Sequence, residues 1–122
     1  MINHAPKVVQ PITFKLIKIN TQQVIEMRDL FLEEDLDPIT YEIKMIEGGS
    51  EYDLPEWISH GVITKQLTIT PLVSHIGYYQ VQIKAIDPFQ AVGIILFQME
   101  VYHMEPKPAE VFVIGTALRT TF

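Results

Sequence analysis

The stretch that decides the fold runs from residue 77 to residue 101 and reads GYYQVQIKAIDPFQAVGIILFQMEV. Apolar side chains recur at every second position in both of its halves, and Asp87-Pro88 separates the halves. This period of two is typical of strands that turn one face toward a core. The inward sets are Tyr79, Val81, Ile83 and Ala85 in the first half and Ile95, Phe97, Met99 and Val101 in the second.

Two further runs extend the pattern toward the N-terminus. One places Ile39, Tyr41, Ile43 and Met45 on a single face, and the other places Ile12, Phe14 and Leu16 there. In the second run Ile17 and Ile19 break step, which predicts a β-bulge. Turn residues separate the runs at Gly48-Gly49-Ser50, Asp53-Leu54-Pro55 and Thr70-Pro71. Strands at short intervals with such turns between them indicate a sandwich or a barrel.

Residues 21–36 are ambiguous in the sequence. Val24, Met27 and Phe31 have helical spacing, and Thr21 is a suitable helix cap. We nevertheless predict a strand followed by an acidic loop, because this order matches the resemblance described below.

Composition excludes several classes of function. The chain has 122 residues, enough for one domain with one core, and a net charge of −6. The acidic balance argues against a nucleic-acid partner and a basic membrane-binding patch, and no apolar stretch is long enough for direct membrane insertion. The absence of cysteine removes disulfides, thiolate metal sites and cysteine nucleophiles. No apolar run of signal-peptide length occurs near Met1, so we expect a domain from a longer protein.

Short motifs occur in a characteristic order over residues 3–101. They are Asn3-His4-Ala5-Pro6, Phe31 followed by spaced acids and Thr40-Tyr41, Leu54-Pro55-Glu56-Trp57-Ile58, Leu67 to Pro71, Gly77-Tyr78-Tyr79, and Ala85-Ile86-Asp87. In this order they resemble the dystroglycan-type cadherin-like repeat, a relative of the immunoglobulin-like repeats of surface proteins. Ile69 and Gln90 stand where that family has glycine. Glycine there supplies a positive φ or a close backbone approach, so these two turns are in question.

The resemblance implies an all-β fold, an antiparallel immunoglobulin/cadherin-like β-sandwich of about seven strands plus a C-terminal extra strand. We expect the sandwich domain to span residues 1–104. Residues 105–122 then form a proline-containing connector and an apolar C-terminal segment with Val111, Phe112, Val113 and Ile114. This segment is either an added strand of this or the next domain, or a strand donated to a neighbouring copy.

The acidic residues suggest one candidate metal site. Glu33, Asp35 and Asp37 alternate along a predicted loop, and Asp87 ends a neighbouring strand in the expected fold. Carboxylate oxygens are the ligands that calcium prefers, so these four residues are candidate calcium ligands. The loop is not an EF-hand, because Pro38 stands where that motif requires glycine. The alternative is an acidic loop that is simply solvated.

Four aromatic residues are expected to anchor the core: Trp57, Tyr79, Phe31 and Tyr41. Trp57 follows a proline and can place its ring between two sheets. Gly77 allows a bend that directs one of the next two tyrosines inward, as in the tyrosine corner of sandwich folds.

Nothing in the sequence indicates catalysis. The four histidines lack metal-ligand spacing, and no nucleophile elbow or phosphate-binding glycine loop occurs. We therefore expect no enzyme activity, no cofactor other than calcium, and a protein partner, a neighbouring repeat or a second copy. By resemblance the chain is a structural or adhesion module of an extracellular or cell-surface protein. The alternatives are a self-assembling subunit linked by its C-terminal strand, and a glycan- or peptide-binding accessory domain. Exposed aromatics gathered on one sheet would favour the accessory domain, with Tyr52, Tyr78 and Tyr102 as candidates.

Overall fold

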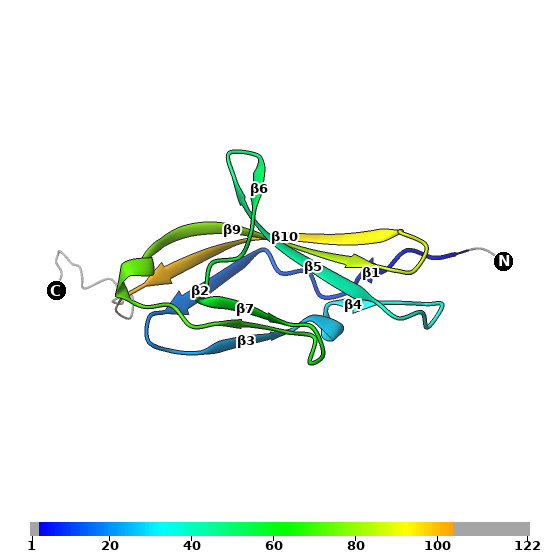
Figure 1. Ribbon diagram of the computed structural model, residues 1–122, viewed down its shortest axis with the longest axis horizontal. Coiled ribbons are helices and arrows are strands. Elements are labelled where there is room, and N and C mark those ends of the chain that lie inside the picture. Colours follow the sequence, from blue (N-terminus) through cyan, green and yellow to red (C-terminus); the bar gives the residue numbers. More distant parts are fainter. Residues whose placement is uncertain (1–2, 104–122) are drawn as a thin grey trace, which may run out of the picture.

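The computed structural model describes residues 3–103. Within that range the chain forms ten strands and two single-turn 3₁₀ helices (Figure 1). In chain order they are β1 (Lys7–Val8), β2 (Phe14–Lys18), β3 (Gln23–Glu26), η1 (Met27–Asp29), β4 (Phe31–Leu32), β5 (Thr40–Glu47), β6 (Ser50–Tyr52), β7 (Ile58–Gly61), β8 (Gln66–Ile69), η2 (Val73–His75), β9 (Gly77–Ile86) and β10 (Val92–Tyr102). The predicted acidic loop joins β4 to β5.

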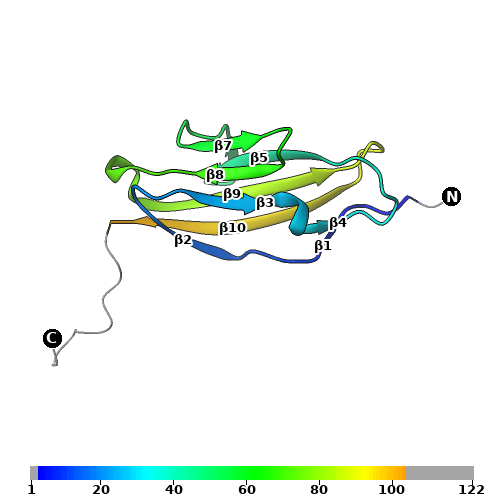
Figure 2. The same cartoon turned by 90° about the horizontal axis from the view of Figure 1, so that it is seen from below.

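The strands form a β-sandwich, as predicted. The larger sheet has the order β2-β10-β9-β5-β6, the smaller sheet has the order β3-β8-β7, and β1 pairs with β4. Figure 2 views the molecule from the side of the smaller sheet. All pairs are antiparallel except β2 with β10, which run parallel.

The core lies between the two sheets and follows the alternation in the sequence. The long strands β9 and β10 direct every second side chain inward, and β3, β7 and β8 supply the opposite layer. The inward residues of β9 and β10 that are buried are Val81, Ile83, Ala85, Ile95, Phe97, Met99 and Val101, and those facing them include Ile25, Ile58, Leu67 and Ile69. The two long alternating runs were therefore interpreted correctly.

The predicted inward face of β2 was wrong. Phe14 and Leu16 are 48% and 41% exposed, whereas Ile17 and Ile19 are buried. The pairing of β2 with β10 continues without a skipped residue over the whole of β2, so this strand contains no bulge. Because successive side chains alternate between faces, a register one residue away from the expected one reverses every side chain.

The strand predicted within residues 21–36 is confirmed, and a single helical turn follows it. β3 pairs with β8, and the chain then makes the single turn η1 before β4. This turn directs Met27 fully into the core and is followed by the buried Leu30 and Phe31. Tertiary packing therefore limits the local helical preference to one turn.

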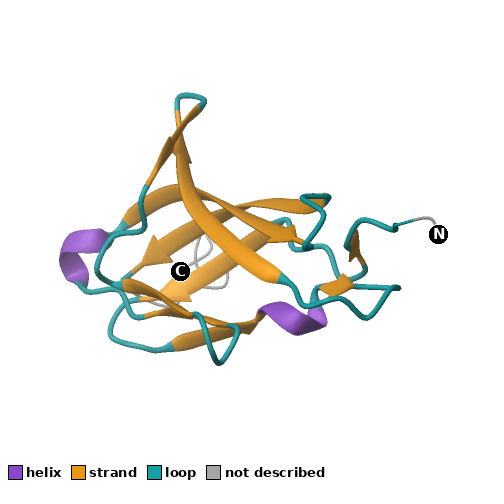
Figure 3. Cartoon of the chain, turned by 45° about the vertical axis from the view of Figure 1, so that its right-hand side comes forward, coloured by secondary structure: helices purple, strands orange, loops and turns teal. Residues whose placement is uncertain are grey.

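The described chain enters at one end of the long axis, near β1, and β10 ends at the opposite end (Figure 1). The hairpin β5–β6 stands away from the sandwich (Figure 3). Its two-residue turn is Gly48-Gly49, with φ of 59° and 81°, as hairpin turns of this kind require. Among the described residues no helix is long and apolar enough to cross a bilayer. The predicted connector and the run from Val111 to Ile114 lie outside the described residues.

Candidate functional site: a linker held on an acidic end

The N-terminal segment of residues 3–6, which we call the linker, is held against two loops at one end of the sandwich, which we call the acidic end. The Asn3 side-chain amide donates a hydrogen bond to Asp87 Oδ2 at 2.8 Å. The backbone N–H of His4 donates to Asp35 Oδ2 at 2.7 Å, and His4 Nδ1 lies 3.0 Å from Asp35 Oδ1. Glu34 adds two longer contacts, with His4 Nε2 at 3.7 Å and with Lys7 Nζ at 3.6 Å. The linker residues are thus fixed relative to the β4–β5 loop and the β9–β10 turn.

Asp87 organises the β9–β10 turn. It is the one buried charged residue of the described chain, with 2% of its surface exposed. Its Oδ1 accepts hydrogen bonds from the backbone N–H groups of Phe89 and Ala91, both at 2.9 Å. Burial opposes ionisation of this carboxyl, but the hydrogen bonds from Asn3 and from the two backbone groups hold its pKa below the ordinary value. The same turn carries Gln90 at a φ of 70°, so the positive φ is kept although glycine is absent.

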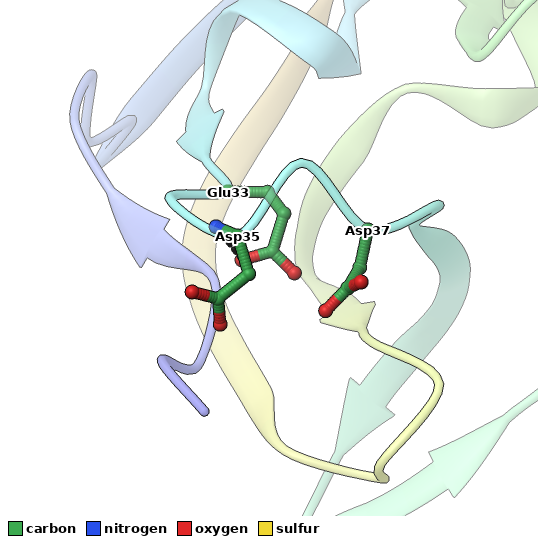
Figure 4. A group of neighbouring side chains, drawn as sticks. All are labelled: Glu33, Asp35 and Asp37. Atoms are coloured by element: carbon green, nitrogen blue, oxygen red, sulfur yellow. Dashed lines mark hydrogen bonds between the residues drawn. The ribbon is translucent and has the colours of Figure 1, made fainter. Parts of the chain in front are cut away.

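Three of the four predicted calcium ligands lie together. Glu33, Asp35 and Asp37 each direct one carboxylate oxygen to within 4.8 Å of the other two (Figure 4). Glu33 Oε2 is buried without a hydrogen-bond partner among residues 3–103, while Oε1 accepts from the Asp35 N–H at 3.4 Å. This spacing suits oxygens around one calcium ion, since calcium–oxygen distances are about 2.3–2.6 Å.

The fourth predicted ligand and the linker complicate that prediction. Asp87 is not part of the three-acid group, and both of its oxygens accept hydrogen bonds from the turn or from Asn3. Both oxygens of Asp35 are engaged by His4. A calcium ion that used Asp35 would compete with His4 for this carboxylate, and calcium binding stays a prediction.

The contacts between His4 and Asp35 change the pKa of both groups. The hydrogen bond to Asp35 and the negative charges of Asp35, Glu34 and Glu33 raise the pKa of the His4 imidazole. The pKa of Asp35 is lowered, first by the backbone N–H of His4 and then by its ring. Each group therefore favours the charged form of the other, which makes attachment of the linker dependent on pH.

The four aromatic residues expected as core anchors occupy two places. Phe31 and Tyr41 are buried with ring centroids 6.0 Å apart, and burial raises the pKa of Tyr41. Trp57 and Tyr79 are partly buried and pack against the core beside His75 of η2. The Trp57 ring stacks on His75 at 4.6 Å and meets the edge of Tyr79 at 5.2 Å.

Tyr79 makes the contact that defines a tyrosine corner. Its hydroxyl donates to the His75 carbonyl oxygen at 2.6 Å, four residues upstream. Gly77 precedes it with a φ of 154°, a backbone conformation that residues with a side chain rarely adopt.

The sequence did not identify Asn3 and His4 as anchors of the linker. Their motif was visible, but no spacing rule relates residue 3 to residue 87 or residue 4 to residue 35. These contacts are visible only in the tertiary structure, which brings the N-terminal segment, the β4–β5 loop and the β9–β10 turn to the same end of the sandwich.

Comparison with known proteins supports the fold alone. No family model matches the chain, and no curated protein matches it significantly. Among solved structures, a nucleoside hydrolase-related protein of Saccharophagus degradans associated with carbohydrate metabolism is similar over 82% of this chain, with a TM-score of 0.62 and 11% identity. An endo-fucoidan hydrolase of glycoside hydrolase family 107 is similar over 84% of the chain, with a TM-score of 0.56 and 16% identity. The titin M4 domain is matched over its whole length and over 84% of this chain, with a TM-score of 0.53 and 11% identity.

These likenesses define the chain as an immunoglobulin-like β-sandwich domain. It spans only 26% of the Saccharophagus protein and 14% of the fucoidan hydrolase, so it resembles one part of each.

Proposed function

We propose that this domain is a non-catalytic structural module, a rigid spacer in a multidomain protein at the cell surface or outside the cell. The finer assignment that we propose is the dystroglycan-type cadherin-like repeat. The observation that carries the spacer role is the attachment of the N-terminal linker to the acidic end by Asn3 and His4.

A spacer transmits orientation only if the chain enters and leaves it in fixed directions. In this domain the described chain enters at one end of the long axis and β10 finishes at the other (Figure 1). Asp35 and Asp87 hold the entering linker on two separate loops, so the linker cannot swing about a single attachment. Linkers without such contacts behave as flexible coils, and domains joined by them reorient freely.

An accessory domain of a larger enzyme is the second candidate. The Saccharophagus protein and the fucoidan hydrolase, each similar to this chain in one part only, are associated with carbohydrate metabolism and with fucoidan hydrolysis, respectively. In that setting the same fixed linker would hold the module against a catalytic neighbour. The proposal of a self-assembling subunit depends on Val111 to Ile114, which lie outside the described residues.

Backbone order of the linker tests the spacer role. Amide ¹⁵N relaxation should give order parameters for His4 and Ala5 near those of the sheet, about 0.85. In Asp35→Asn the pairing with His4 is weakened, so these values should fall toward the flexible range, below about 0.6. Asp37→Asn is the matched control, because the linker forms no hydrogen bond with Asp37. Order parameters below about 0.6 in the unmodified chain would refute a fixed linker.

A further inference from the structure

The outer face of the larger sheet carries a hollow beside the projecting hairpin. The hairpin β5–β6 rises at one edge of this sheet (Figure 3). Between it and the start of β9 lies a space of about 410 Å³. Its lining includes Ile46, Glu47, Tyr78, Gln80 and Gln98. This volume falls within the usual range for small-molecule sites, roughly 300–1,000 Å³.

Strand register extends the lining into a platform. Gln80 pairs with Ile46 on one side and with Gln98 on the other, and Gln98 pairs with Phe14 of β2. These side chains lie on the outer face, because their neighbours Val81, Phe97 and Met99 point into the core.

A second row of the platform starts at Tyr78. Tyr78 pairs with Glu100, which pairs with Leu16, and Tyr102 lies two residues farther along β10 on the same face. Tyr78 is 79% exposed. Phe14, Tyr78 and Tyr102 thus lie on the outer face of one sheet, whereas Tyr52 of β6 does not line the hollow.

We propose that this platform, which we call the tyrosine–glutamine platform, binds a neutral oligosaccharide. An exposed aromatic ring packs against the C–H face of a pyranose, and this contact needs no charge. The amides of Gln80 and Gln98 each offer donors and an acceptor to sugar hydroxyls, and the carboxylate of Glu100 accepts from them. No described residue that lines the hollow is Lys or Arg, whereas Lys18 pairs with Tyr102 at the end of the second row. The net charge of −6 disfavours an anionic glycan.

A proline-rich peptide is the main competitor, since it also packs on aromatic rings. Proline residues offer carbonyl acceptors and no N–H donor. Glu100 of the platform would then face an acceptor-rich ligand without compensation. Sugar hydroxyls both donate and accept, so the observed side chains favour the oligosaccharide.

Binding measurements on the full chain test the proposal. The probes are hexasaccharides of cellulose, xylan, mannan, laminarin and β-galactan, together with an oligoproline peptide. The binding of each probe is measured by isothermal titration calorimetry. We expect at least one neutral hexasaccharide to bind, with a loss of at least about tenfold in affinity in Tyr78→Ala and in Gln98→Ala. Tyr52→Ala, which removes an exposed aromatic outside the hollow, should change the affinity by less than about twofold.

Thermal melting followed by circular dichroism shows whether each variant is folded. Tyr78→Ala should have the same Tm as the unmodified chain, because the side chain of Tyr78 is exposed. The proposal is overturned if none of the five sugars binds, if Tyr78→Ala binds as well as the unmodified chain, or if only oligoproline binds. The platform does not involve the linker, so these outcomes leave the spacer role to its own test.

Discussion

Trp57→Ala is the most informative substitution for the fold. Trp57 is partly buried, packs against the core, stacks on His75 and contacts the edge of the Tyr79 ring. Removing the ring therefore removes two aromatic contacts together with part of the apolar area that the side chain buries.

The expected cost follows from these contacts. Truncation of a fully buried aromatic residue costs about 3–5 kcal/mol. Trp57 is only partly buried, so we expect about 2–3 kcal/mol, of which each ring pair accounts for about 0.5–1.5 kcal/mol. In a domain of this size each kcal/mol lowers the Tm by about 4–5 °C, so the Tm should fall by about 8–15 °C.

The assay is chemical and thermal unfolding followed by circular dichroism. Fluorescence is unsuitable, because Trp57 is the single tryptophan and the variant lacks the signal. Tyr52→Ala is the matched control: its side chain is 52% exposed, so the free energy of unfolding should change by no more than about 0.5 kcal/mol. A loss below about 1 kcal/mol in Trp57→Ala would refute its role as an anchor.

Three further predictions concern the end that holds the linker. Because the pKa of His4 is raised, its charged imidazole stabilises the attached linker fully below pH 6.5, and this stabilisation is lost as the pH rises through the pKa of His4 in the folded state. Because the pKa of Asp35 is lowered, its carboxylate stabilises the attached linker above pH 3.8, and this stabilisation is lost as the pH falls through the pKa of Asp35 in the folded state. NMR shifts of the linker amides should therefore indicate the tightest attachment between these two pH values, and a shift profile that is flat with pH contradicts this. Gly93→Ala should destabilise the chain by about 1–3 kcal/mol in denaturant titrations, because the added methyl group would meet the carbonyl oxygen of Pro6; an unchanged midpoint would show that the N-terminal segment does not cross β10 there. Calcium should raise the Tm, more so in His4→Ala, where Asp35 is released, and less in Asp37→Asn; no heat on titration and no change in Tm would exclude the calcium site.

The fold was largely predictable because burial of one sheet face leaves a period of two in the sequence. Residues 39–45, 79–85 and 95–101 were assigned to strands, and Val81, Ile83, Phe97 and Met99 are buried as expected. The error in β2 has the same physical origin. Its run contains apolar residues on both faces, so the alternation did not indicate which set faces the core.

The candidate site was predictable only in part. The acids of the β4–β5 loop lie close together because they alternate within one loop, a local property that the sequence shows. Asp87 was expected beside them, but it lies outside the three-acid group, and its oxygens accept hydrogen bonds from the turn and from Asn3. Hydrogen bonds between residues more than thirty positions apart follow from the packing of loops, which sequence spacing does not encode.

The sequence by itself determined the class of fold and the position of the long strands, and it predicts that nucleic acid is not a partner. These properties depend on composition and on local periodicity, both of which are present in the order of the residues along the chain. Tertiary structure decided the inward face of β2, the attachment of His4 to Asp35, and the gathering of Tyr78, Gln80 and Gln98 on one outer face. These depend on strand order and register, which are fixed by the simultaneous burial of both sheets rather than by any single stretch of the chain.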